Sequence, residues 1–225
     1  MASLIDILHK QKRVSVLQVS NARYAPLDLS VANGNLTPEI SSDCSKLGHY
    51  IDDFLENNNA NIGYGGYNER RGIYRRSTIF NDNDHDERNI HIGMDLWAPA
   101  GTSILAALDG EVHSFKFNGG QGNYGPTVIL QHKIENLTFY TLYGHLDMEC
   151  LPSLSVGQTF RQGDVIGRLG NEAVNGDYPP HLHFQIIGDI GNHSGDYPGV
   201  CSTSEREFYL SNCPDPNLLL KIQST

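Results

Sequence analysis

Residues 90–97 read Ile-His-Ile-Gly-Met-Asp-Leu-Trp and alternate apolar side chains with polar or very small ones. Successive side chains of a β-strand point to opposite faces, so His91, Gly93 and Asp95 would share one face of such a strand. The apolar side chains between them would lie on the other face, in the core. This stretch therefore predicts a strand with one core face and one face that carries chemically active groups.

Two further stretches alternate in the same way and contain three more histidines. The stretch His-Leu-His-Phe-Gln puts His181 and His183 on one face of a strand, and the stretch Tyr-Gly-His-Leu puts His145 on the same face as Tyr143. An antiparallel sheet can leave one face solvated, where imidazole and carboxylate groups need no buried partner. We therefore expect three strands to bring these side chains together on one open face.

The chain after residue 90 is rich in strand-forming residues separated by Gly, Pro, Asn and Asp. The expected strands cover 90–97, 103–108, 111–117, 126–133, 137–145, 164–169 and 181–187. Residues 107–112 and 156–167 resemble the two half-motifs of biotinyl and lipoyl domains, without their carrier lysine. The sequence predicts a mainly β fold, an antiparallel sheet with hairpins like those of a barrel-sandwich hybrid.

Helical patterns lie near the two ends of the chain. We expect helices over 3–12 and 37–55, the second with Thr37 as its cap and Pro38 in its first turn. Apolar residues recur at three- and four-residue steps in the second segment, which indicates a helix face that packs on the core. A further helix is expected over 203–211.

A change of composition near residue 60 suggests a domain boundary. We predict an accessory helical segment over 1–60 and a main domain over 61–225 with a C-terminal extension. Residues 63–66, Gly-Tyr-Gly-Gly, are expected to form a flexible loop, because the Lys and Ser/Thr of a phosphate loop are missing. The aspartates of 81–89 lack the Gly and Glu of a calcium loop, so an acidic solvated loop is expected there.

Charge and composition exclude several classes of function. Sixteen Lys and Arg against 26 Asp and Glu give a formal charge of −10. A phosphate backbone is negative and attracts basic proteins, so we expect no nucleic-acid partner. The sequence shows no transmembrane run of about 18 apolar residues and no signal peptide. The four cysteines contain no Cys-x-x-Cys pair and are expected to be reduced structural thiols.

The polar residues of the three strands have the chemistry of a zinc site. Two histidines and one aspartate would fill three positions of a zinc tetrahedron and leave the fourth for water. Gly93 would leave space beside the ion. The sequence contains no His-Glu-x-x-His motif, which excludes a thermolysin-like arrangement of zinc ligands.

Three motifs in this order resemble the LytM/lysostaphin-type zinc metallopeptidases, peptidase family M23. They are His-x-x-x-Asp at 91–95, Tyr-Gly-His-Leu at 143–146 and Pro-Pro-His-Leu-His-Phe at 179–184, and the likeness covers roughly 73–187. The stretch at 101–112 and the Val-Gly-Gln turn at 156–158 belong to the same pattern.

The resemblance implies a role for each of the five residues. His91, Asp95 and His183 would bind one zinc ion per chain, and His145 and His181 would assist hydrolysis by a zinc-activated water. It also implies a metalloendopeptidase that acts on peptide or peptidoglycan cross-links, either Gly-Gly or D-amino-acid linkages. The oligomeric state is not predicted.

Two alternatives stay open at this point. A zinc-holding binding or regulatory module could recognise its ligand without cleaving it. The insertion at 81–89 and the tail at 188–220 are more similar to a subset of M23-type domains that are fused to kinase-like and aminotransferase-like domains, which would indicate a larger protein with a substrate outside the cell wall.

Overall fold

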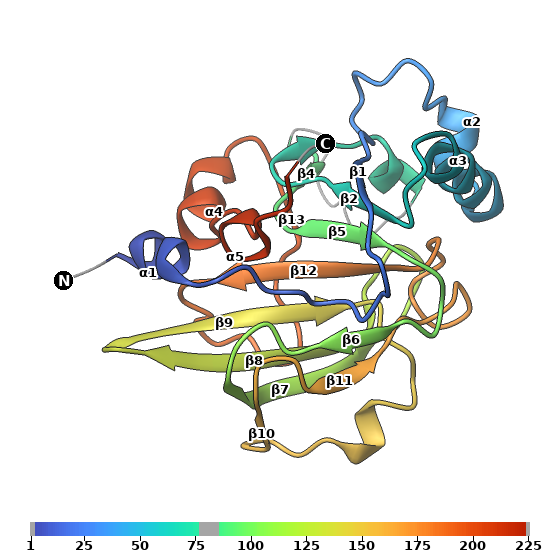
Figure 1. The fold of residues 1–225 in the computed structure, drawn as a ribbon. Coiled ribbons are helices and arrows are strands. Elements are labelled where there is room, and N and C mark those ends of the chain that lie inside the picture. The colour runs from blue at the N-terminus through green and yellow to red at the C-terminus, as the bar shows by residue number, and fades with distance from the viewer. Residues whose placement is uncertain (1–2, 77–85, 224–225) are drawn as a thin grey trace.

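Figure 1 shows the fold in a computed structural model, which describes residues 3–76 and 86–223. The helices are α1 (Leu4–Lys10), α2 (Pro38–Ser41), α3 (Cys44–Asn57), α4 (Arg206–Asn212) and α5 (Asn217–Leu220), with 3-10 turns η1 (Ile73–Arg76) and η3 (Leu151–Ser153). The strands are β1 (Tyr24–Pro26), β2 (Ile62–Gly65), β3 (Glu69–Arg70), β4 (Ile90–His91), β5 (Met94–Trp97), β6 (Ser103–Leu105), β7 (Gly110–Asn118), β8 (Gly125–Ile134), β9 (Leu137–Gly144), β10 (Thr159–Phe160), β11 (Val165–Arg168), β12 (His181–Ile187) and β13 (Val200–Cys201).

The architecture is mainly β, as the sequence predicted. The main sheet has the order β1-β2-β5-β12-β9-β8-β7-β10, and smaller sheets are formed by β11-β6 and β13-β4-β3. Among the described strands every pairing is antiparallel except that of β1 with β2. The sheets are open, and helices lie around the edge that carries β1, β2 and β5 (Figure 1). No described helix is long and apolar enough to cross a membrane.

Strand β12 lies in the middle of the main sheet, and all seven of its residues are buried. On one side it pairs with β5, which places His183 opposite Asp95, and on the other with β9, which places His183 opposite Gly144. Directly paired residues of an antiparallel ladder project to the same face. The register therefore puts a histidine and a carboxylate from distant parts of the chain side by side.

Two of the three hydrophobic clusters among the described residues join the site strands to the N-terminal segment. The larger one packs Phe184 and Tyr143 of the main sheet against Leu8 and Val16 of the N-terminal segment. The second lies under α3 and contains Leu27, Leu29, Leu47, Ile51, Ile73, Tyr74, Trp97, Tyr178 and Val200. The first 60 residues thus contribute to both clusters, and the boundary at residue 60 stays a prediction.

The expected N-terminal helix forms as α1, where Ser3 and Asp6 make a reciprocal capping box. The helix expected over 37–55 is two helices. Thr37 caps α2 as predicted, but Asp43 accepts a hydrogen bond from the Lys46 amide (2.9 Å) and starts a second helix, α3. A capping side chain inside an apolar pattern therefore divided the predicted helix.

The interpretation of 63–66 as a flexible loop was wrong, because Gly63 and Gly65 lie in strand β2. A Cβ atom on Gly65 would lie 2.5 Å from the carbonyl oxygen of Leu27, so glycine permits the close approach of the neighbouring chain. The expected strand 90–97 is divided at residues 92–93 into β4 and β5, which belong to different sheets. Of the acidic loop 81–89, residues 81–85 lie outside the described part.

Candidate metal and catalytic site

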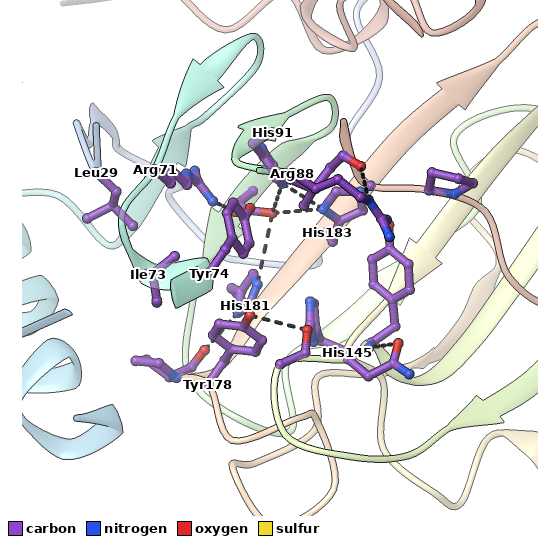
Figure 2. Close-up of a pocket in the computed structure, with 18 of the residues that line it drawn as sticks. Leu29, Arg71, Ile73, Tyr74, Arg88, His91, His145, Tyr178, His181 and His183 are labelled. Atoms are coloured by element: carbon purple, nitrogen blue, oxygen red, sulfur yellow. Dashed lines mark hydrogen bonds and ion pairs between the residues drawn. The ribbon is translucent and has the colours of Figure 1, made fainter. Parts of the chain in front are cut away.

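The five residues singled out in the sequence all lie around one cavity. His91 comes from β4, Asp95 from β5, His181 and His183 from β12, and His145 from the position that follows β9 (Figure 2). Their exposed fractions are between 2% and 5%. The expectation of an open, solvated face was therefore wrong: segments far away in the sequence cover these side chains.

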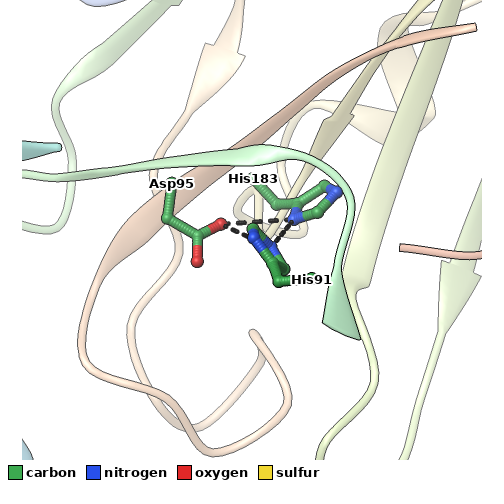
Figure 3. A group of neighbouring side chains, drawn as sticks. All are labelled: His91, Asp95 and His183. Atoms are coloured by element: carbon green, nitrogen blue, oxygen red, sulfur yellow. Dashed lines mark hydrogen bonds and ion pairs between the residues drawn. The ribbon is translucent and has the colours of Figure 1, made fainter. Parts of the chain in front are cut away.

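His91, Asp95 and His183 form a compact cluster (Figure 3). The Nε2 atom of His91 lies 2.9 Å from Nδ1 of His183, and Oδ1 of Asp95 lies 3.3 Å from the former and 3.2 Å from the latter. Their potential ligand atoms lie within 4.8 Å of one another. This is the donor set, two imidazoles and a carboxylate, that zinc binds in hydrolases.

The outer ring nitrogens of this cluster are held by oxygen acceptors. His91 donates from Nδ1 to the Gly66 carbonyl (2.9 Å), and His183 donates from Nε2 to Oε1 of Gln185 (2.9 Å). The amide of Gln185 is itself oriented by a bond from its Nε2 to the Pro198 carbonyl (3.1 Å). In the tautomers that these acceptors favour, the facing nitrogens present lone pairs. With these tautomers, two lone pairs and a carboxylate oxygen point at a common centre, an arrangement that fits a cation.

Gly93 provides room for this cluster, as its small size suggested. A Cβ atom at Gly93 would lie 2.4 Å from Cε1 and 2.5 Å from Nε2 of His183. Any larger residue would therefore displace the imidazole that faces His91.

The outer oxygen of Asp95 is bound by a buried arginine that the sequence reasoning did not single out. Arg71 donates from Nη1 to Oδ2 of Asp95 (2.5 Å) and from Nε to Glu69 (2.5 Å), and its side chain is 4% exposed. Burial alone would raise the pKa of the Asp95 carboxyl, but His91 and Arg71 outweigh it and hold that pKa well below its usual range. Asp95 is thus a carboxylate that offers Oδ1 to the cluster while Oδ2 is occupied.

His145 and His181 lie next to the cluster, with ring centroids 4.1 Å apart. His145 donates from Nδ1 to the Asn175 carbonyl (2.6 Å), and His181 donates from Nδ1 to the Pro179 carbonyl (2.8 Å). Nε2 of His181 lies 3.9 Å from Oδ1 of Asp95. The Nε2 atoms of both rings are therefore the ones that can exchange a proton.

Burial keeps these imidazoles neutral. It lowers the pKa of His91 to about 4, and it lowers the pKa of His181 and, further, that of His145, where the neighbouring His181 adds to the effect. Neutral imidazoles are the form that binds metals and accepts protons.

The sequence placed His145 on the same strand face as Tyr143, and this reason for its position was wrong. Tyr143 pairs with Phe184 and packs into the large core cluster, on the face away from His183. His145 follows the end of β9 and has φ of 65°, a left-handed conformation that breaks the alternation. This turn of the backbone, and not the strand period, brings the ring to the cavity.

The cavity has a volume of about 300 Å³. Its walls also include aromatic and aliphatic residues that the sequence reasoning did not assign, and these are Leu29, Leu47, Ile73, Tyr74, Trp97, Tyr124, Tyr178, Tyr197, Pro198 and Val200. Asn175 was left unassigned in the sequence and is fully buried. Its side chain bonds Gly170 and both backbone groups of Tyr178, which fixes the loop that holds His145 and His181.

A mainly β fold with a buried His-Asp-His cluster and two further neutral histidines defines a candidate metallohydrolase. Residues 89–194 match the profile of peptidase family M23, and all five site residues fall within that match. Residues 89–194 thus form a peptidase M23 domain.

Curated relatives agree with the family. The chain is 38% identical over 98 residues to the peptidoglycan DD-endopeptidase ShyC of Vibrio cholerae, covering 43% of this chain and 20% of that protein. It is 34% identical over 128 residues to the DD-carboxypeptidase/endopeptidase Mpg of Neisseria meningitidis, covering 54% of this chain and 26% of that protein. The chain thus spans about a fifth to a quarter of the length of these relatives.

Among solved structures, the catalytic domain of the antimicrobial peptidase lysostaphin from Staphylococcus simulans is similar. The two are 23% identical, with a TM-score of 0.42, over 70% of this chain and 96% of that chain.

Proposed function

We propose that the protein is a zinc-dependent metalloendopeptidase that hydrolyses peptide bonds of the peptidoglycan type. The observation that carries this proposal is the convergence of two imidazole nitrogens and one carboxylate oxygen at 2.9–3.3 Å. The names of relatives from Vibrio and Neisseria, a DD-endopeptidase and a DD-carboxypeptidase/endopeptidase, favour D-amino-acid linkages over Gly-Gly bonds as the substrate.

In this proposal His91, Asp95 and His183 hold one zinc ion. Bound zinc supplies Lewis acidity, which lowers the pKa of a water ligand to about 7 and polarises the scissile carbonyl. Arg71 keeps Asp95 ionised and leaves it a single free oxygen. Gln185 and the Gly66 carbonyl accept from the outer nitrogens of the two histidines and so orient the inner nitrogens toward the ion.

His145 and His181 move protons in the proposed reaction. Each ring is oriented by a backbone carbonyl at Nδ1, so its Nε2 can accept a proton from the attacking water and return one to the leaving amine. Their low pKa values keep both rings neutral at pH 7, ready to act as bases. Two positioned imidazoles therefore do the proton transfer that a glutamate does in other zinc peptidases.

A second candidate function is a zinc-holding module that binds a peptide without cleaving it. The burial of all five polar residues favours it, because a covered site restricts access of a substrate. A peptidase-like domain of a larger protein with a substrate outside the cell wall is a variant of the same idea.

A cleavage assay distinguishes these candidates. Cross-linked peptidoglycan fragments and a glycine-rich peptide would be incubated with zinc-loaded protein, with chelated protein, and with chelated protein to which zinc is returned. We expect cleavage that is lost on chelation and restored by zinc, and absent in the matched variant His145→Ala. Stoichiometric zinc without cleavage of either substrate would contradict the peptidase and favour the binding module.

A further inference from the structure

About half of the residues that line the cavity lie outside the segment that matches the family. Leu29, Leu47, Ile73 and Tyr74 precede residues 89–194, and Tyr197, Pro198 and Val200 follow them. Figure 2 shows Leu29, Ile73 and Tyr74 on the side of the cavity opposite His183 and His145. A substrate can reach the five polar residues only through the space that these walls leave.

Tyr178, which lines the cavity, is held in place by a contact between two segments. The guanidinium of Arg76, at the end of η1, lies 4.4 Å from the ring centroid of Tyr178 and donates to the Asp177 carbonyl. Its Nη1 lies 3.7 Å from Oδ2 of Asp177, and the side chain is 5% exposed. A buried cation stacked on an aromatic ring and bonded to the adjacent backbone ties η1 to the loop before His181.

A third segment joins the same point. The Tyr178 hydroxyl donates to the Gly122 carbonyl (3.3 Å), and Gln121 donates from Nε2 to Oδ2 of Asp177 (3.0 Å). The ring of Tyr178 then contacts His145 and His181, with centroids 5.3 and 5.6 Å apart. Three loops therefore meet against the catalytic histidines.

We propose, on the basis of the proposed function, that this latch, made by Arg76, Gln121, Asp177 and Tyr178, restricts the peptidase to short soluble peptides. A volume of about 300 Å³ is at the lower end of the range for small-molecule sites, about 300–1,000 Å³. A cross-link inside an insoluble polymer carries bulky chains on both sides of the scissile bond and needs a groove that is open at both ends. The substrate class is therefore the soluble peptide fragment.

The test compares two substrates with the same scissile linkage. Rates per bond, with and without chelator, would be measured on a soluble cross-linked peptide and on the insoluble polymer from which it was released. We expect the soluble peptide to be cleaved at least about tenfold faster, which corresponds to about 1.4 kcal/mol in the barrier. The ratio of the two rates does not depend on the fraction of folded protein.

Matched variants locate the cause of the selectivity. Arg76→Met removes the latch cation, and since Nε of Arg76 has no hydrogen-bond partner among the described residues, we expect this variant to fold. Its rate ratio should fall toward one, and the exposed Gln121→Ala should lower the ratio in the same direction. Arg75→Met, which changes a 69% exposed neighbour paired with Glu87, should keep the ratio of the original protein.

The outcomes separate the two proposals. Equal, chelator-sensitive rates on both substrates would overturn the restriction and leave the peptidase intact. A high ratio that neither Arg76→Met nor Gln121→Ala lowers would overturn the role of the latch. Cleavage of neither substrate by zinc-loaded protein would instead contradict the proposed function itself.

Discussion

The strand pair β5–β12 and the segments that cover it are held together in different ways. The strand pair is fixed by a backbone ladder in the middle of an eight-stranded sheet, with β12 buried along its whole length. The cover is held by individual side chains, above all Arg71 and Arg76, which reach across from residues 69–76. The ladder determines which ligand atoms lie next to one another. The side-chain contacts determine the charge of those ligand atoms and which substrates can reach them.

This difference predicts that changes in the ladder region abolish function and that changes in the cover tune it. The largest effect is expected for His183→Ala, which removes one of the three ligands that face a common point. Zinc content should fall from near one per chain to near zero, and activity with it. Elemental analysis together with the cleavage assay measures both, and a variant that keeps zinc and turnover would refute the ligand assignment.

The next effect is expected for His145→Ala, which leaves the metal cluster intact. Loss of a positioned general base typically costs a factor of about 10² to 10⁴ in rate. We therefore expect full zinc content with activity reduced by this factor. Loss of zinc in this variant would show that His145 supports the metal and not proton transfer.

A smaller effect is expected in the cover, for Arg71→Met. The variant removes the bond to Oδ2 of Asp95 without changing any ligand. Loss of such a supporting contact typically weakens metal binding about 10- to 100-fold. Zinc affinity measured by competition with a chelator checks this, and Arg70→Met is the control, because Arg70 is exposed and bonds Thr203. Equal affinities for the two variants would mean that the buried contact has no role.

The smallest effect on function is expected for His132, a strand histidine that lies outside the site. Both of its ring nitrogens are occupied, by the Asp109 carbonyl (2.8 Å) and the Thr141 hydroxyl (2.7 Å), so it has no lone pair to offer a metal. His132→Gln should therefore keep zinc and activity at neutral pH.

The same histidine predicts a dependence of stability on pH. Burial lowers the pKa of His132 to about 4 from an ordinary value of 6.5. Between these two values the unfolded chain binds a proton that the folded chain does not. The free energy of unfolding is therefore unaffected by His132 above pH 6.5 and decreases by at most about 3 kcal/mol as the pH falls toward 4. Denaturant unfolding at pH 6.5 and at pH 4 should show a smaller loss of unfolding free energy for His132→Gln than for the original protein. The exposed His49→Gln is the control, and equal losses for both variants would contradict the assignment.

Strand periodicity and spacing predicted most of the sheet and the faces of His91, Asp95, His181 and His183, whereas His145 reaches the cavity for another reason. The alternation in 90–97 and 181–187 was sufficient because buried neighbouring strands enforce a register. Periodicity could not predict the conformation of His145, since a single residue with φ of 65° reverses the expected face.

The cover could not be predicted, because nothing local links Arg71 to Asp95 or Arg76 to Tyr178. These pairs form only when η1 packs beside β5 and the loop before β12. Arginine clusters in a sequence indicate a basic surface, yet here two of the four arginines at 70, 71, 75 and 76 are buried partners of the site. Two glycines carried structural information, because Gly65 lies against the backbone of Leu27 and Gly93 lies against the ring of His183.

The most direct test of the account is the zinc content of the original protein. Protein purified without a histidine tag and dialysed after exposure to zinc would be measured by elemental analysis. The account predicts about one zinc ion per chain, because two imidazole nitrogens and a carboxylate oxygen converge at 2.9–3.3 Å. A protein that retains no zinc under these conditions would contradict it.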